Sequence, residues 1–172
     1  LLIIFLLLGL SILLQFNSSA ILVGLLSMPF VIIYPLMKRI TYWPQIFLGF
    51  AFSWGVLIVT TQFNQLLAYE FIFLYAACVM WTLGYDTIYA YQDIEDDIKQ
   101  NIKSTAVYFG KNGRIFVTLC YTSVLFIFGY LGWISSNSIF SLFIIAILGI
   151  CTYIAIQKWD INSPKSSNFY FR

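Results

Sequence analysis

The sequence predicts an all-α fold, a polytopic bundle of transmembrane helices, and three observations support the prediction. Hydrophobic residues make up 61% of the 172 residues, whereas charged residues make up only 9%. The mean hydropathy of +0.88 is well above that of soluble globular domains. The apolar residues also form long runs, most of them near the ~20 residues that a helix needs to cross the hydrocarbon core.

Six such runs follow one another and predict six spans. They cover residues 1–14, 20–37, 46–64, 67–90, 115–134 and 139–156. The first run is short because the chain opens at Leu1 inside it, with no initiator Met and no charged segment of a signal peptide. No repeat or linker divides the chain. We therefore expect residues 1–172 to be a single membrane domain and an internal piece of a longer protein.

The charges between the spans predict the orientation of the chain. The loops opposite the basic ends are short and uncharged, with Glu70 the only acid placed toward them. The positive-inside rule puts the basic ends on the cytoplasmic or matrix side. A net charge of +2 gives no indication of a nucleic-acid partner. All nine basic residues fall at the same ends of the spans: Lys38, Arg39, Lys99, Lys103, Lys111, Arg114, Lys158, Lys165 and Arg172.

The chain has no His, and its three cysteines stand alone. Cys78, Cys120 and Cys151 each lie within an apolar run, without CxxC spacing. Structural zinc, haem ligation by His and Cys–His catalysis therefore have no residues to use. We interpret the cysteines as small apolar residues of the helices.

One short segment concentrates the acidic residues. Five of the seven acids lie in the twelve positions from Asp86 to Asp97. If the segment is helical, Asp93 and Asp97 stand one turn apart on one face, where carboxylate oxygens can converge on a hard divalent cation. Asp86 lies inside the end of the preceding span, and an ionisable group at that depth is a functional candidate. The simpler alternative is a solvated loop.

A second polar segment, residues 34–45, ends the second span on the same side. Tyr34 and Lys38 are four residues apart, so phenol and ammonium share a helical face and can hold an oxyanion together. The alternative is that Lys38 and Arg39 anchor the helix at the membrane surface, with the tyrosines and Trp43 as an interfacial aromatic belt.

At these residues the chain resembles a known family. Residues 85–110, YDTIYAYQDIEDDIKQNIKSTAVYFG, resemble the second aspartate-rich signature of the UbiA superfamily of membrane prenyltransferases, in particular its 4-hydroxybenzoate polyprenyltransferase branch. Residues 34–45, YPLMKRITYWPQ, are similar to the YPxxKR and WPQ stretch of that branch. Members of the family have about nine spans and an earlier NDxxDxxxD motif, whereas this chain has no Asp before Asp86. The resemblance therefore implies that the first motif and the last span are missing.

The resemblance implies a transferase. Such an enzyme moves a polyprenyl group from polyprenyl diphosphate to 4-hydroxybenzoate in ubiquinone biosynthesis and releases diphosphate. Asp93 and Asp97 would be the metal ligands for Mg²⁺ and, with Lys38, the catalytic residues. The membrane would be the bacterial inner membrane or the mitochondrial inner membrane. We expect the 172 residues alone to be inactive or nearly so.

We expect substrate contacts for four residues, two of them from the resemblance and two from the chemistry of their side chains. Tyr34 and Lys38 would contact the diphosphate, and Arg39 would pair with the carboxylate of the benzoate, which a guanidinium matches in bidentate fashion. Lys103 would reach the diphosphate or neutralise the acidic loop. Asp86 would be a structural or proton-handling group.

Three alternatives stay open at the level of the sequence. The acceptor could be another molecule, such as a haem, chlorophyllide, homogentisate or dihydroxynaphthoate, or the chain could be an inactive membrane remnant. A secondary transporter or channel with an acidic vestibule is the third. Transporters usually place their coupling carboxylates near the bilayer midplane, so the position of these acids near the membrane surface favours a diphosphate site.

Overall fold

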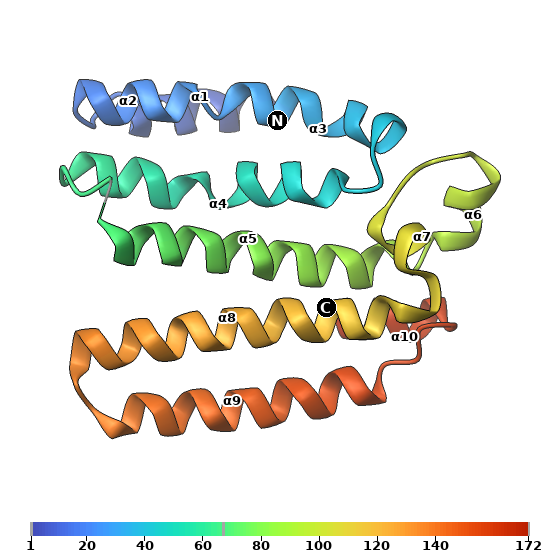
Figure 1. The fold of residues 1–172 in the computed structure, drawn as a ribbon. Helices are drawn as coiled ribbons and strands as arrows, with labels where there is room; N and C mark the ends of the chain where they lie inside the picture. The colour runs from blue at the N-terminus through green and yellow to red at the C-terminus, as the bar shows by residue number, and fades with distance from the viewer. Residues whose placement is uncertain (1, 67, 172) are drawn as a thin grey trace.

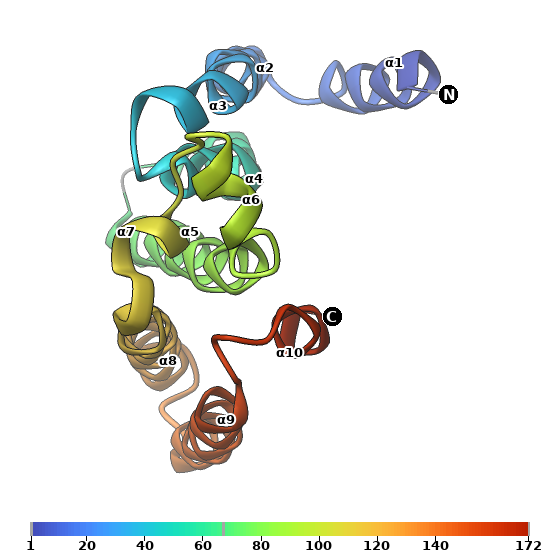
Figure 2. The same cartoon turned by 90° about the vertical axis from the view of Figure 1, so that its right-hand side faces the viewer.

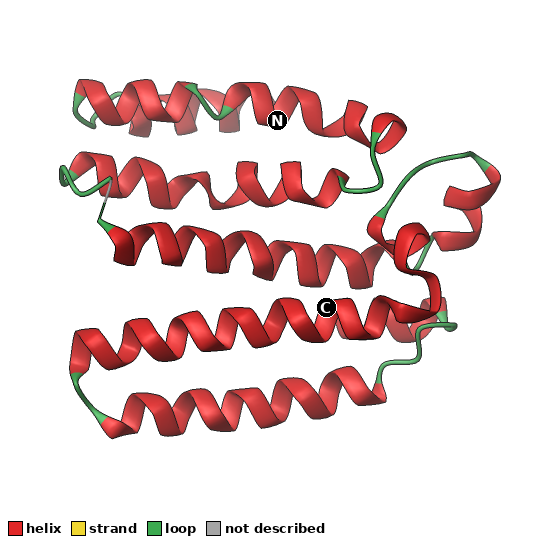
Figure 3. Cartoon of the chain, in the orientation of Figure 1, coloured by secondary structure: helices red, strands yellow, loops and turns green. Residues whose placement is uncertain are grey.

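The computed structural model describes residues 2–66 and 68–171, so Leu1, Leu67 and Arg172 lie outside the described residues. The described chain folds into helices and contains no strand (Figure 3). The helices are α1 (Leu2–Leu13), α2 (Ser18–Leu25), α3 (Met28–Ile40), α4 (Pro44–Gln62), α5 (Tyr69–Ala90), α6 (Ile94–Lys99), α7 (Thr105–Phe109), the 3₁₀ helix η1 (Gly110–Asn112), α8 (Gly113–Ser136), α9 (Ile139–Lys158) and α10 (Pro164–Phe171).

Five helical stretches among the described residues are long and apolar enough to cross a membrane, which confirms the predicted fold class. The first predicted span is the shorter apolar helix α1. The five stretches are Ser18–Ile40, Pro44–Gln62, Tyr69–Ala90, Thr105–Ser136 and Ile139–Lys158.

The second predicted span is divided into α2 and α3. Pro29 stands in the first turn of α3 and has no backbone N–H to donate, so the helical hydrogen bonds are interrupted there. The Ser27 hydroxyl donates to the carbonyl oxygen of Gly24 at 2.7 Å, and the Trp54 indole donates to that of Val23 at 2.7 Å. Polar backbone atoms near the break thus have partners, as an apolar bilayer requires.

The long helices run antiparallel to their neighbours and lie side by side (Figure 1). The helix α5 is central, because it packs against α4 on one side and α8 on the other. Figure 2 shows that the helices follow an arc, with α10 on its inner side against α5. Close approach depends on small residues, as is usual between membrane helices: a Cβ on Gly49 of α4 would come within 3.0 Å of Val79 on α5.

The connections α3–α4, α5–α8 and α9–α10 all lie at one end of the bundle (Figure 1). This end carries the basic residues of the described chain, and Glu70 lies in the first turn of α5 at the opposite end. The structure therefore gives the segregation of charge that the sequence predicts. The side of the membrane that this end faces stays a prediction.

Gly113, the first residue of α8, permits a tight contact with Tyr91. A Cβ on Gly113 would overlap the phenol of Tyr91, which is buried and donates a hydrogen bond to the carbonyl oxygen of Gly110. We expect Gly113→Ala to lower the free energy of unfolding in detergent by about 1–3 kcal/mol through overpacking. Gly9→Ala is the matched control, since nothing lies within 4 Å of its added methyl. Equal stability of the two variants would show that Tyr91 is free to move.

Candidate active site

The acidic segment is a turn followed by a short helix. The helix α5 ends at Ala90, and α6 begins at Ile94 with Asp93 as its N-cap residue. The backbone N–H of Asp97 donates to the carbonyl oxygen of Asp93 at 2.9 Å, so the two aspartates lie one turn apart, as predicted. The Asp93 side chain makes no capping hydrogen bond. Its carboxylate is therefore available to a ligand.

The chain leaves α6 through a left-handed residue and turns back toward α3. Asn101 has φ +55°, a conformation that asparagine tolerates better than most residues. The N–H of Ile102 then donates to the carbonyl oxygen of Asp97 at 2.8 Å, and that of Asn101 to Ile98 at 3.2 Å, which is the hydrogen-bond pattern of a Schellman motif. This turn directs the residues after α6 onto the C-terminal end of α3.

A backbone hydrogen bond joins the acidic and the basic segments. The N–H of Lys103 donates to the carbonyl oxygen of Lys38 at 2.8 Å, and the Lys103 ammonium donates to that of Ile40 at 3.0 Å. Two connections that are about 60 residues apart in the sequence thus form one unit. Lys103 satisfies the last carbonyls of α3, where a cation is also favoured by the helix dipole.

Lys38 lies in the last turn of α3, and its side chain is exposed. Its ammonium lies 5.7 Å from the centre of the Tyr34 ring and within electrostatic range of both Asp86 and Asp97. Burial is the main cause that raises the pKa of Asp97, and the Ser104 hydroxyl and Lys38 oppose it, while Asp93 adds to it. The pKa of Asp97 stays above its usual value, so a further positive charge nearby would stabilise its ionised form.

The other basic residues predicted for the site make fewer contacts with the acidic segment. Arg39 is exposed, and Lys103 lies over the ring of Tyr42 at 5.4 Å as well as on the end of α3. In the described part of the chain the one ion pair joins Lys99 to Asp96 at 3.4 Å, with both side chains 69% exposed. A pair this exposed contributes little to stability.

Buried neutral residues support the site, and sequence reasoning missed them. The hydroxyls of Thr87 and Thr105 lie 2.7 Å apart, and the Thr105 N–H donates to the side-chain oxygen of Gln45 at 3.3 Å. These residues join α4, α5 and α7, and each is at most 2% exposed. All three belong to the two motifs that carried the resemblance. Gln45 is the Gln of WPQ, Thr87 is the Thr of YDT, and Thr105 is the Thr of STA. The motifs therefore marked these positions in the sequence. The sequence predicted a function for Asp86 but did not distinguish a structural role from proton handling.

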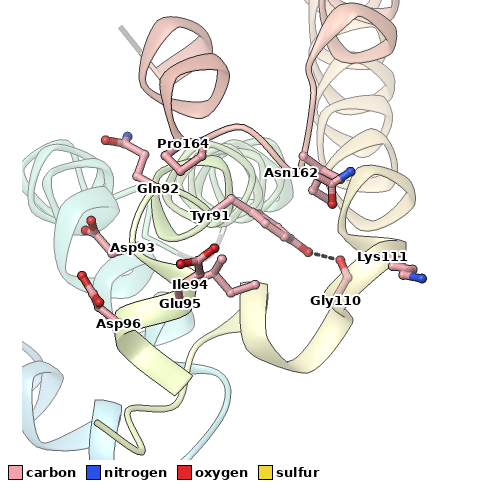
Figure 4. A pocket seen from close by; sticks show the side chains of 11 residues that line it. Tyr91, Gln92, Asp93, Ile94, Glu95, Asp96, Gly110, Lys111, Asn162 and Pro164 are labelled. Carbon is pink, nitrogen blue, oxygen red and sulfur yellow. Dashed lines mark hydrogen bonds between the residues drawn. The ribbon is translucent and has the colours of Figure 1, made fainter. Parts of the chain in front are cut away.

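Two cavities flank the acidic segment. One, of about 510 Å³, lies between residues 91–96 and residues 110–111 and 161–164. Figure 4 shows the Tyr91 hydroxyl directed to Gly110, with the Asp93 and Asp96 carboxylates on the other side of the segment. The second, of about 800 Å³, lies between Asp93 and α10.

A third, apolar cavity of about 560 Å³ lies in the membrane-spanning part between α4, α5 and α8. Tyr85, the residue before Asp86, is at one end of its lining along α5, and Cys78 is at the other. Trp81 and Phe52 add aromatic rings to its wall. The apolar cavity thus extends along α5 to the residue before Asp86.

The donor set suits a magnesium ion that carries phosphate. Within the described residues no three acidic or cysteine side chains lie close enough to hold a metal by themselves. Mg²⁺ is usually held by one or two carboxylates together with phosphate oxygens of a substrate. Asp93 and Asp97, one turn apart, are carboxylates of the type that such an ion uses.

The chain belongs to the UbiA prenyltransferase family, whose model matches residues 1–172. It is 40% identical over 159 residues to the mitochondrial 4-hydroxybenzoate polyprenyltransferase of Drosophila melanogaster, covering 91% of this chain and 40% of that protein. It is 50% identical over 114 residues to the mitochondrial 4-hydroxybenzoate polyprenyltransferase of Arabidopsis thaliana, covering 66% of this chain and 28% of that protein. These matches confirm the resemblance inferred from the two motifs.

A bacterial relative and a solved structure agree. The chain is 35% identical over 133 residues to 4-hydroxybenzoate octaprenyltransferase of Klebsiella pneumoniae, covering 77% of this chain and 46% of that protein. The apo structure of a UbiA homolog from Aeropyrum pernix K1 matches with a TM-score of 0.70 at 18% identity, covering 92% of this chain and 62% of that one, which supports the fold. The chain thus spans less than half the length of these three curated relatives.

Proposed function

We propose that the protein transfers a polyprenyl group from polyprenyl diphosphate to 4-hydroxybenzoate in ubiquinone biosynthesis and releases diphosphate. The observation that carries the proposal is the backbone bond from Lys103 to Lys38, which joins the segment that carries Asp93 and Asp97 to the end of α3 that carries Lys38. Acids and a base gathered at one end of a membrane bundle suit a diphosphate headgroup. The names of the relatives support the choice of donor and acceptor.

The proposed reaction requires charge separation. The bond between the allylic carbon and the diphosphate oxygen breaks, which leaves negative charge on diphosphate and positive charge on the allylic carbon. Lys38 and the Tyr34 hydroxyl contact the leaving oxygens and stabilise their charge. Mg²⁺ held by Asp93 and Asp97 supplies further neutralisation of the diphosphate when it is bound.

The apolar cavity beside Tyr85 serves the other half of the reaction. It keeps water from the allylic cation, and the faces of Trp81 and Tyr85 attract positive charge. The ring carbon ortho to the acceptor hydroxyl forms the new carbon–carbon bond and then loses its proton. Asp86, near both Tyr34 and Lys38, is the group that we assign to proton handling. Arg39 pairs with the acceptor carboxylate.

The proposed location follows from the charged end of the bundle. We place this end in the cytoplasm of a bacterium or in the mitochondrial matrix, with the helices in the inner membrane. Relatives with mitochondrial and with bacterial origins support both settings.

The test is an acceptor comparison. The protein, expressed from its complete gene and purified in detergent, is given polyprenyl diphosphate and Mg²⁺ with 4-hydroxybenzoate, homogentisate or dihydroxynaphthoate. We expect prenylated 4-hydroxybenzoate and diphosphate in equal amounts and little product from the other two. A preference for another acceptor would overturn the assignment of substrate, and no product from any would overturn the assignment of activity.

A further inference from the structure

The C-terminal helix α10 reaches the segment that carries Asp93. The side-chain amide of Asn168 donates to the side-chain oxygen of Gln92 at 3.1 Å, across 76 positions of sequence. The ring of Phe171 also packs against Tyr89, with centroids 4.7 Å apart, and against Tyr85 at 6.2 Å. The residue next to Asp93 is thus bonded to a different part of the chain.

Separate contacts hold α10 on the bundle. The buried Trp159 donates from its indole to the hydroxyl of Ser167 at 3.0 Å, and both residues are fully buried. The Arg114 guanidinium donates to the carbonyl oxygen of Trp159. Because these bonds do not involve the acidic segment, α10 provides a fixed support for it.

Asp93 depends on its neighbours for its position. Its own side chain is exposed and makes no capping bond. The two residues before it are bonded in different directions, Tyr91 to the carbonyl oxygen of Gly110 and Gln92 to Asn168. Ligand groups must be held within about 0.5 Å of their working geometry. These two bonds hold the backbone before Asp93, and the bond from the Asp97 N–H to the Asp93 carbonyl oxygen holds it after.

The Gln92 amide is held at a cost to stability. Its side-chain nitrogen is buried and has no hydrogen-bond partner within the described residues. A buried donor without a partner costs about 1–3 kcal/mol, and replacing both members of a pair by apolar groups is often neutral. The pair therefore adds little to the free energy of unfolding, which indicates that it has a role other than stabilising the fold.

We infer that Gln92 and Asn168 form a positioning pair, through which α10 fixes the Asp93 carboxylate for a magnesium diphosphate. The inference rests on the proposed function of Asp93 as a metal ligand. Asp93 and both members of the pair line the cavity of about 800 Å³ next to α10, so the pair borders the same open space as the Asp93 side chain.

The test is a calorimetric titration of the complete protein in detergent with Mg²⁺ in the presence of inorganic diphosphate. Removal of a residue that orients a metal ligand typically costs 10–100-fold in metal affinity. We expect Asn168→Leu and Gln92→Met each to weaken Mg²⁺ binding roughly tenfold. The double variant should lose no more than either single variant, since each already breaks the same bond. The unfolding transition of the double variant should match that of the parent protein.

Asn112→Leu is the matched control, because Asn112 is exposed at the same end of the bundle and its side chain caps nothing. It should leave the titration unchanged. Parent affinity in the Asn168→Leu and Gln92→Met variants would overturn the positioning pair while the proposed function stands. A loss of affinity that only follows a loss of stability would overturn it as well. Absence of Mg²⁺-dependent diphosphate binding in the parent would instead contradict the proposed metal site.

Discussion

Replacement of Asp97 by Asn is expected to lower the rate of prenyl transfer by about 10²–10³-fold, the size of effect seen when one preorganised electrostatic contact is removed. Asn keeps the size of the side chain and removes its charge. The backbone carbonyl of Asp97, which accepts the bond from Ile102, is unaffected, so the turn after α6 should form as before. Steady-state turnover at saturating Mg²⁺ measures the effect.

Asp96→Asn is the control for this variant. Asp96 belongs to the same short helix, but its side chain is 69% exposed, and within residues 2–66 and 68–171 its one ion pair is with Lys99. We expect its turnover to stay close to that of the parent. Equal losses in Asp96→Asn and Asp97→Asn would mean that the total negative charge of the segment matters and that the position of Asp97 does not.

Lys38→Met is expected to lower turnover by about 10²-fold, through weaker stabilisation of the leaving diphosphate. Methionine retains most of the apolar stem of lysine, and the carbonyl oxygen of residue 38 still accepts the bond from Lys103. The fold should therefore survive, and the loss should be in kcat more than in the KM for 4-hydroxybenzoate. Product formation with limiting and with saturating acceptor separates the two.

Lys99→Met controls for the general loss of a positive charge at this end of the bundle. Lys99 is exposed and pairs with the exposed Asp96. Its turnover should be unchanged. A similar loss in the Lys99 variant would point to the surface potential of the whole end as the cause, and the specific role of Lys38 would have to be abandoned.

The fold could be predicted because lipid imposes a simple length requirement. Runs of about 20 apolar residues have few alternatives to a spanning helix, and five stretches agree with the predicted ones. The interruption at Ser27 was not predicted, although Pro29 was visible. A proline in an apolar run can kink a helix or divide it, and the outcome depends on whether neighbours such as Trp54 can satisfy nearby carbonyls.

The two motifs of the candidate site could be found in the sequence, but the contacts of their buried neutral residues could not be predicted. Thr82 and Thr118 bond to carbonyls four residues earlier in their own helices, whereas Thr87 bonds across to Thr105. The local sequence of a threonine does not show whether its hydroxyl bonds within its own helix or to another helix, because either partner satisfies the hydroxyl. The bond of Asn168 to Gln92 depends likewise on where α10 lies, which no local pattern specifies.

The interruption at Ser27 and the bond from Lys103 to Lys38 have a joint mechanical consequence. The helix that carries Lys38 is separated from α2 by a break at its start, and at its end it is bonded to the acidic segment. We therefore expect a tilt of α3 to displace the acidic segment with it.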